Sequence, residues 1–182
     1  ADNYLPNVWI GATICNQEEA DRDIPKLLAV PSEKRFLSME PLLGSVNIRW
    51  ALSRNPLEIA AGFLERGYFA PDLEKIKRLD WIIVGGESGQ KARPMHPLWV
   101  RDLRDQCAAA GVPFLFKQWG EWFPTSIRQG GTTLGAWNGD DFMPGWGDIK
   151  NPENNMVRAG KQSFGGRLLD DKMHDEYPEV SA

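Results

Sequence analysis

The chain has 182 residues, of which 42% are hydrophobic and 25% are charged, and its formal net charge is -4. This composition is that of an ordinary globular protein and argues against extensive disorder, and its slight acidity argues against a surface that neutralises many phosphates. No apolar run approaches the ~18 residues of a membrane span, and the N-terminus carries no secretion signal, so we expect a cytoplasmic protein without membrane contact.

Four short apolar runs rich in β-forming residues predict buried strands. They span residues 8–14, 35–40, 81–84 and 114–117. Because the runs are apolar on both faces and alternate with helical segments, they indicate parallel β/α units rather than a meander. The predicted fold is therefore α/β: a partial (half) TIM-like β/α barrel with about four parallel strands, formed by residues 1–123.

Two helices have clear boundary signals. The first begins after Asn16, an N-cap whose capping box is completed by Glu19, and Pro25 is expected to kink or shorten it. The second begins near Pro97, a good first-turn residue, and ends at Gly111 before the fourth strand.

The rest of the chain is predicted less regularly. Residues 47–80 form an insertion between the second and third strands, with two short helices expected around 57–63 and 73–79. From 124 to 182 the periodicity fades and Gly, Asn and Asp recur, which is typical of loops. We expect this part to be a loop-rich extension packed on the same domain.

Candidate functional residues lie where the parallel strands end, because β/α proteins build their sites at that edge. Alternation along the second strand places Ser38 and Glu40 on one face, and alternation along the third brings Glu87 to the corresponding face. We expect both glutamates to point into a barrel-like interior as catalytic carboxylates. The competing interpretation is a structural salt bridge that closes the rim. The candidate partners for such a bridge are Arg35, Arg93 and Lys117.

Further candidates follow the third and fourth strands. Gly85, Gly86 and Ser88 are candidate cofactor contacts, because glycines after a parallel strand let backbone N–H groups approach an anion or a ribose. Their spacing fits neither a P-loop nor a dinucleotide fingerprint, and a plain tight turn is the alternative. The candidate substrate-binding residues are Ser38, Arg93, Lys117 and Gln118. Trp119 and Trp122 are predicted as core and His96 as a capping or surface residue, and no metal site is predicted.

Several of these segments resemble one known family. They are residues 7–11, 35–44, 81–89, 92–95, 116–122, 160–161 and 166–170. They are similar to the C-terminal part of a phage and bacterial family of uncharacterised proteins that carry a radical-SAM-like three-cysteine motif near the N-terminus. The resemblance extends from Asn7 to Pro178. It implies a partial β/α barrel whose N-terminal half binds a [4Fe-4S] cluster and S-adenosylmethionine, and a companion called the three-Cys-motif partner protein.

This chain has only Cys15 and Cys107, so it lacks the three-cysteine motif and is expected to bind no cluster and to be inactive alone. It begins with Ala1 rather than Met, and we expect it to be cut from a longer protein. The predicted function is that of the C-terminal half-barrel of a radical-SAM-like protein, completed by the missing N-terminal half and acting on a nucleic acid or nucleotide.

Two alternatives belong to other classes. One is a sugar hydrolase that uses Glu40 and Glu87 as its two carboxylates. The other is a non-enzymatic scaffold or docking module, whose open barrel edge is covered by a dimer mate or by the C-terminal extension.

Overall fold

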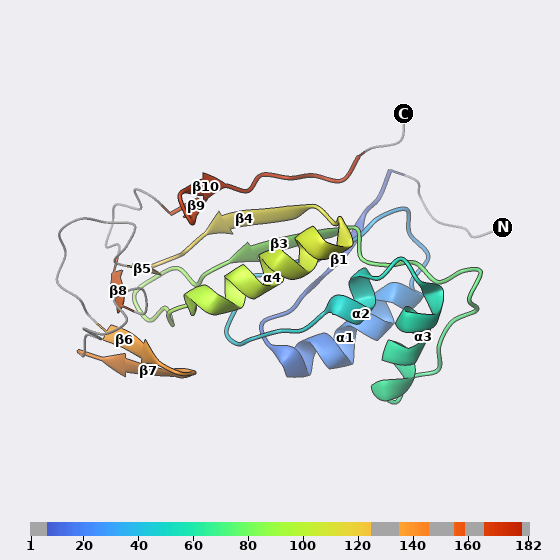
Figure 1. Cartoon of the computed structure of the whole chain (residues 1–182), viewed down its shortest axis with the longest axis horizontal. Helices are drawn as coiled ribbons and strands as arrows, with labels where there is room; N and C mark the ends of the chain where they lie inside the picture. Colours follow the sequence, from blue (N-terminus) through green and yellow to red (C-terminus); the bar gives the residue numbers. More distant parts are fainter. Residues whose placement is uncertain (1–6, 125–134, 146–154, 159–165, 180–182) are drawn as a thin grey trace.

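The computed structural model describes residues 7–124, 135–145, 155–158 and 166–179 (Figure 1). Its first part alternates strands and helices. These are β1 (Ile10–Thr13), α1 (Gln17–Ala29), β2 (Arg35–Met39), α2 (Arg49–Leu52), α3 (Pro56–Glu65), β3 (Trp81–Gly85), α4 (Pro97–Ala110) and β4 (Phe114–Gln118). Short strands follow: β5 (Trp122–Pro124), β6 (Gly135–Asn138), β7 (Asp141–Pro144), β8 (Asn155–Arg158), β9 (Leu168–Leu169) and β10 (Lys172–Met173).

The first four strands form one parallel sheet in the order β1-β2-β3-β4. Each strand coincides with one of the apolar runs, so the α/β class and the four parallel strands are confirmed. Sequential order places each strand beside the next one along the chain, as short βα connections favour. The sheet formed by the described strands is open and does not close into a barrel (Figure 1).

The ends of α1 and α4 agree with their boundary signals. Asn16 caps α1 by accepting the N–H of Glu19 at 3.0 Å. Gly111 ends α4 with a left-handed φ of 61°. Pro25 does not shorten α1, which continues to Ala29 with the proline inside it.

The insertion between β2 and β3 differs from the prediction. Of the two helices expected there, the one around residues 57–63 is α3, whereas 73–79 is no helix and α2 was not predicted. The physical reason lies in Arg78, whose guanidinium donates to the carbonyl oxygens of Leu52 and Ala110. These bonds hold the chain that leads from a turn at residues 73–75 into β3, and Leu79 is fully buried.

The two faces of the parallel sheet differ in their cover. Alternate residues of β2 and β3 are buried in the core with residues of the helices; these are Leu37, Met39, Ile82 and Val84. The residues between them are only half-buried on the opposite face; these are Phe36, Ser38, Trp81 and Ile83. We call this second side the open face.

The C-terminal part is more regular than the expected loop-rich extension. Strands β5, β8, β6 and β7 pair antiparallel in that order, and β9 pairs with β10. These strands have two to four residues each, which is too short for a period of two to develop in the sequence. The rest of the extension lies outside the described residues.

Residues 174–177 lie antiparallel along the outer side of β4, and we call them the C-terminal strap. Phe116 donates its N–H to the carbonyl of His174 at 2.9 Å, and Glu176 donates to the carbonyl of Phe114 at 3.3 Å. The strap therefore covers one edge of the parallel sheet, as was anticipated for the scaffold alternative. None of the helices in the described part of the chain is long and apolar enough to cross a membrane.

Candidate functional site

The candidate site lies on the open face, where the strands end. Ser38 and Ile83 are neighbours in the β2–β3 register, and Glu40 follows β2 by one residue. Lys117 near the end of β4 completes the same side. Together with Gln118 and other residues, these side chains line a hollow of about 720 Å³. The structure thus brings four of the predicted site residues, Ser38, Glu40, Lys117 and Gln118, to one hollow.

Glu40 and Lys117 form an ion pair across this hollow. Lys117 Nζ lies 2.9 Å from Glu40 Oε2, with 57% of the lysine side chain and 19% of the glutamate side chain exposed. Glu40 Oε1 is buried and has no hydrogen-bond partner among the described residues. A buried acceptor without a partner is uncommon and costs free energy unless a donor reaches it. This oxygen is therefore an unsatisfied acceptor of the site.

Gly85 makes room for that carboxylate. A Cβ at this position would stand 2.4 Å from Glu40 Oε1, inside van der Waals contact. The glycine therefore allows the Glu40 carboxylate to lie flat against the end of β3 rather than turn into solvent. Its own carbonyl accepts the N–H of Leu42 at 3.0 Å, which fixes the chain that follows Glu40.

Glu87 is engaged elsewhere, by Arg93. The guanidinium of Arg93 donates to both carboxylate oxygens at 2.9 Å, and the Arg93 backbone N–H donates to Oε2 at 2.7 Å. The Arg93 side-chain hydrogen bonds, followed by the backbone bond, lower the pKa of Glu87 to about 2. A general acid requires a raised pKa, so this geometry argues against Glu87 as the acid of a two-glutamate hydrolase. It agrees with the structural salt-bridge interpretation instead.

Gly86 has a packing role. Its N–H donates to the carbonyl of Gln118 at 2.9 Å, and a Cβ on Gly86 would stand 1.9 Å from the carbonyl oxygen of Trp119. The ends of β3 and β4 approach so closely that only a glycine fits. Ser88 Oγ accepts a hydrogen bond from Gln118 Nε2 at 3.2 Å, which adds a second link between the same two segments.

The residues predicted to be structural occupy structural positions. Trp119 is 1% exposed and belongs to the core, while Trp122 is half-buried and donates its indole N–H to the carbonyl of Ala92 at 2.8 Å. His96 is the N-cap of α4 and accepts the N–H of Leu98 at 3.0 Å. Burial lowers the pKa of His96, which favours the neutral ring that this cap requires.

An aromatic row at the other end of the open face was not predicted. The Trp81 ring contacts Trp9 with centroids 6.2 Å apart, Phe36 at 5.9 Å and Tyr177 at 4.9 Å. The alternation of residues along β2 and β3 could have placed two of them on the open face, because Phe36 shares a strand face with Ser38 and Trp81 shares one with Ile83. No sequence signal placed Tyr177, which the C-terminal strap brings from the far end of the chain.

A family model described as "Protein of unknown function (DUF5131)" matches residues 1–178. The chain belongs to this family. No match was found among curated proteins, and none among solved structures. Since the family's own description names no activity, the chemistry of this DUF5131 protein has to be argued from its residues.

The cysteines of this DUF5131 protein do not fit an iron–sulfur cluster. Cys15 is half-buried before α1, and its thiol pKa is raised by burial and by the nearby Glu19. Cys107 is buried in α4, and burial raises its pKa to about 12. Cluster ligands are thiolates gathered at one place, whereas these thiols are protonated and lie in separate elements. Within the described residues, no group of three or more His, Cys, Asp or Glu side chains is placed to hold a metal ion.

Proposed function

We propose that this chain is the C-terminal half of a β/α barrel and supplies the rim of a ligand site to the complete barrel. The observation that carries the proposal is the Glu40–Lys117 pair over a hollow of about 720 Å³ on the open face. Parallel sheets are normally covered on both faces, whereas the helices in the described part of this chain pack on one face of the sheet. The open face therefore corresponds to a barrel interior that further strands would enclose.

The free edge of the sheet at β1 is where further strands would add, and the strap at β4 leaves such a barrel open on that side. The strap occupies the outer side of β4, whereas β1 is the other edge strand and has β2 as its one strand neighbour among the described residues. Gly11 and Thr13 of β1 are exposed. In the proposed assembly, the missing N-terminal half adds its strands at β1. A dimer mate at the same edge is the alternative occupant.

The resemblance to radical-SAM-like proteins supplies the proposed reaction class. In this scheme S-adenosylmethionine and a [4Fe-4S] cluster belong to the complete phage-type protein, and the three-Cys-motif partner protein is its companion. The cluster ligands come from the other half, since Cys15 and Cys107 do not fit the role. The proposed setting is the cytoplasm, where both thiols stay reduced.

In this scheme, the role of this chain is to bind and orient a substrate. Glu40 accepts a donor of the substrate at its unpartnered Oε1, and Lys117, being the more exposed member of the pair, contacts an anionic group. A nucleotide or nucleic acid offers both features, with exocyclic amino groups on its bases and phosphates on its backbone. The Glu87–Arg93 pair holds the loop after β3 in place beside this site.

The test is to extend the chain by the residues encoded before Ala1 and to reconstitute the product anaerobically with iron and sulfide. The extended protein should show charge-transfer absorption and cleave S-adenosylmethionine. Glu40→Gln and Lys117→Met should keep the absorption and lose substrate-dependent turnover. The absence of both absorption and cleavage in the extended wild-type protein would contradict the proposal.

A docking role without catalysis is the second candidate, and exposed apolar side chains favour it. Leu57 and Leu64 on one side of α3 are 64% and 63% exposed, and Phe69 in the following loop is 98% exposed. Contiguous exposed apolar residues often mark protein-binding surfaces. A Leu57→Glu/Leu64→Glu double variant distinguishes the two candidates: it should abolish partner binding in the docking case and leave S-adenosylmethionine cleavage unchanged in the barrel case.

A further inference from the structure

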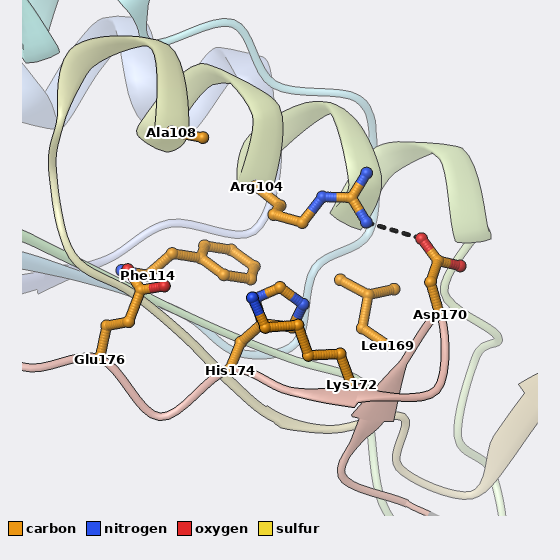
Figure 2. A pocket seen from close by; sticks show the side chains of 8 residues that line it. All are labelled: Arg104, Ala108, Phe114, Leu169, Asp170, Lys172, His174 and Glu176. Carbon is orange, nitrogen blue, oxygen red and sulfur yellow. Dashed lines mark hydrogen bonds and ion pairs between the residues drawn. The ribbon is translucent and has the colours of Figure 1, made fainter.

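A second hollow lies on the helix side of the sheet, away from the candidate site. It has a volume of about 380 Å³ and lies between α4 and the C-terminal end of the chain (Figure 2). Successive side chains of the strap alternate between the two sides of the sheet. His174 and Glu176 line this hollow, while Tyr177 lines the hollow on the open face. The two hollows therefore share the strap and no lining side chain.

His174 is the unexplained group of this hollow. It is 8% exposed, its imidazole packs edge-on against the Phe114 ring with centroids 5.7 Å apart, and Figure 2 shows it pointing into the space. None of the hydrogen bonds between side chains of the described residues involves its ring nitrogens, and neither nitrogen belongs to the fully enclosed polar atoms that lack a partner, so both face the hollow. Burial, then the charges of Lys172 and Arg104, lower the pKa of His174. The neutral ring offers one N–H donor and one acceptor.

The walls of the hollow are apolar and its mouth is charged. Phe114, Leu169 and Ala108 form the walls. The guanidinium of Arg104 at the mouth is already neutralised, because it donates to Asp105 at 2.8 Å and to Asp170 at 2.6 Å.

Lys172 is the free cation of the lining. Its side chain is exposed and forms no ion pair with any residue in the described ranges. Glu176, the other acid of the lining, accepts the N–H of Phe114 at 3.1 Å. In Figure 2 it lies on the opposite side of the His174 ring from Lys172. Lys172 thus places a positive charge on one side of the imidazole, and the Glu176 carboxylate places a negative charge on the other side.

We propose that this hollow binds a small monocarboxylate with an apolar body. The carboxylate lies between the Lys172 ammonium and the ring N–H of His174, and the apolar body packs on Phe114 and Leu169. The carboxylate of the ligand matches Lys172, the cation of the lining that has no ion-pair partner among the described residues. The volume lies within the range of small-molecule pockets. Such a ligand would hold the strap against α4.

The test uses benzoate as the probe and the intact chain. The chain has 2 histidines, so a His174→Gln variant assigns the two imidazole signals in a proton–carbon NMR spectrum. Benzoate titrated through the millimolar range should shift the His174 signal to saturation and leave that of His96 in place. Benzamide, which has the same shape without the charge, should cause no saturable shift at the same concentrations.

Two lysine variants complete the test. Lys172→Met should weaken benzoate binding about tenfold through loss of the charge-assisted contact, and its exposed position leaves the fold intact. Lys117→Met, which removes a similar charge from the open face, should bind benzoate as the wild type does. No saturable shift with benzoate, unchanged affinity in Lys172→Met, or lost affinity in Lys117→Met would each overturn the proposal.

Discussion

Replacing Gly86 by alanine tests the contact between the ends of β3 and β4. The added Cβ would stand 1.9 Å from the carbonyl oxygen of Trp119 and 2.6 Å from its carbonyl carbon. Both neighbouring atoms belong to backbone, so no side-chain rotation relieves the clash. The two segments must separate by more than 1 Å to reach the 3.0 Å below which real Cβ atoms are essentially not found.

That separation would break the hydrogen bond from Gly86 N–H to the carbonyl of Gln118. Overpacking typically costs about 1–3 kcal/mol. A lost buried hydrogen bond adds about 1 kcal/mol. We therefore expect Gly86→Ala to lower the free energy of unfolding by about 3 kcal/mol, a large part of the 5–15 kcal/mol typical of a domain.

Urea unfolding followed by tryptophan fluorescence measures this change, since the chain has 8 tryptophans. The midpoint should fall by about 1–2 M for a typical urea slope. Gly44→Ala is the matched control, because a Cβ there meets its nearest neighbour, Asn16 Cβ, at an ordinary 3.6 Å. It should change stability by less than about 0.5 kcal/mol. If Gly86→Ala unfolds at the same urea concentration as Gly44→Ala, the close approach of β3 and β4 is wrong.

Three further outcomes are expected. Arg93 lowers the pKa of Glu87 to about 2, so the Glu87 carboxylate stabilises the fold above pH 4.5 and this stabilisation is lost as pH falls toward 2. Glu87→Gln should remove it, so the urea midpoint of the variant should change less between pH 4.5 and pH 2 than that of the wild type. Since the Arg93 guanidinium is well exposed, the lost stabilisation should stay below about 1 kcal/mol. Identical dependence of the urea midpoint on pH in the variant and the wild type would refute the prediction. His96→Ala should lower the free energy of unfolding by about 1 kcal/mol, because it removes the N-cap of α4, whereas His96→Asn should keep most of the wild-type stability. Thermal unfolding measures both variants, and equal losses of stability would exclude the capping role. Lys117→Met should change the melting temperature little, because its ion pair with Glu40 is largely exposed on the lysine side; a cooperative loss of structure by circular dichroism would contradict this.

The acid response of His96 follows from the same geometry. Burial lowers its pKa in the folded chain, so the unfolded chain takes up a proton first as pH falls below 6.5. Stability is therefore fully present above this pH and decreases below it. His96→Asn removes the proton uptake, so its urea midpoint should change less between pH 7 and pH 5 than that of the wild type. Parallel profiles of the two proteins would show that this histidine is not the group that titrates.

The parallel sheet was predictable because local and global signals agree in it. Each strand is a short apolar run, and alternation along β2 correctly assigned Leu37 to the core side and Ser38 to the open face. The caps at Asn16 and Gly111 were predictable for a local reason. An asparagine side chain can accept the first free N–H groups of a helix, and a glycine readily adopts the left-handed conformation that ends one.

Other features depend on contacts between residues far apart in sequence. Arg93 donates two side-chain hydrogen bonds and one backbone hydrogen bond to the Glu87 carboxylate. These bonds depend on how the loop after β3 folds back. Arg78 donates to carbonyls 26 and 32 positions away and so holds the chain that leads into β3, where the sequence pattern predicted a helix over residues 73–79. Alternation placed Glu40 on the open face, but its pairing with Lys117 depends on the β2-β3-β4 strand order.

The strap has a consequence for how the protein is made. The outer side of β4 gains its neighbour only when His174 and Glu176 have been synthesised, about 60 residues after Phe114 and Phe116 are added to the chain. Until then the growing chain presents an unpaired strand edge with aromatic side chains. We therefore expect the parallel sheet to be complete only after nearly the whole chain has been made.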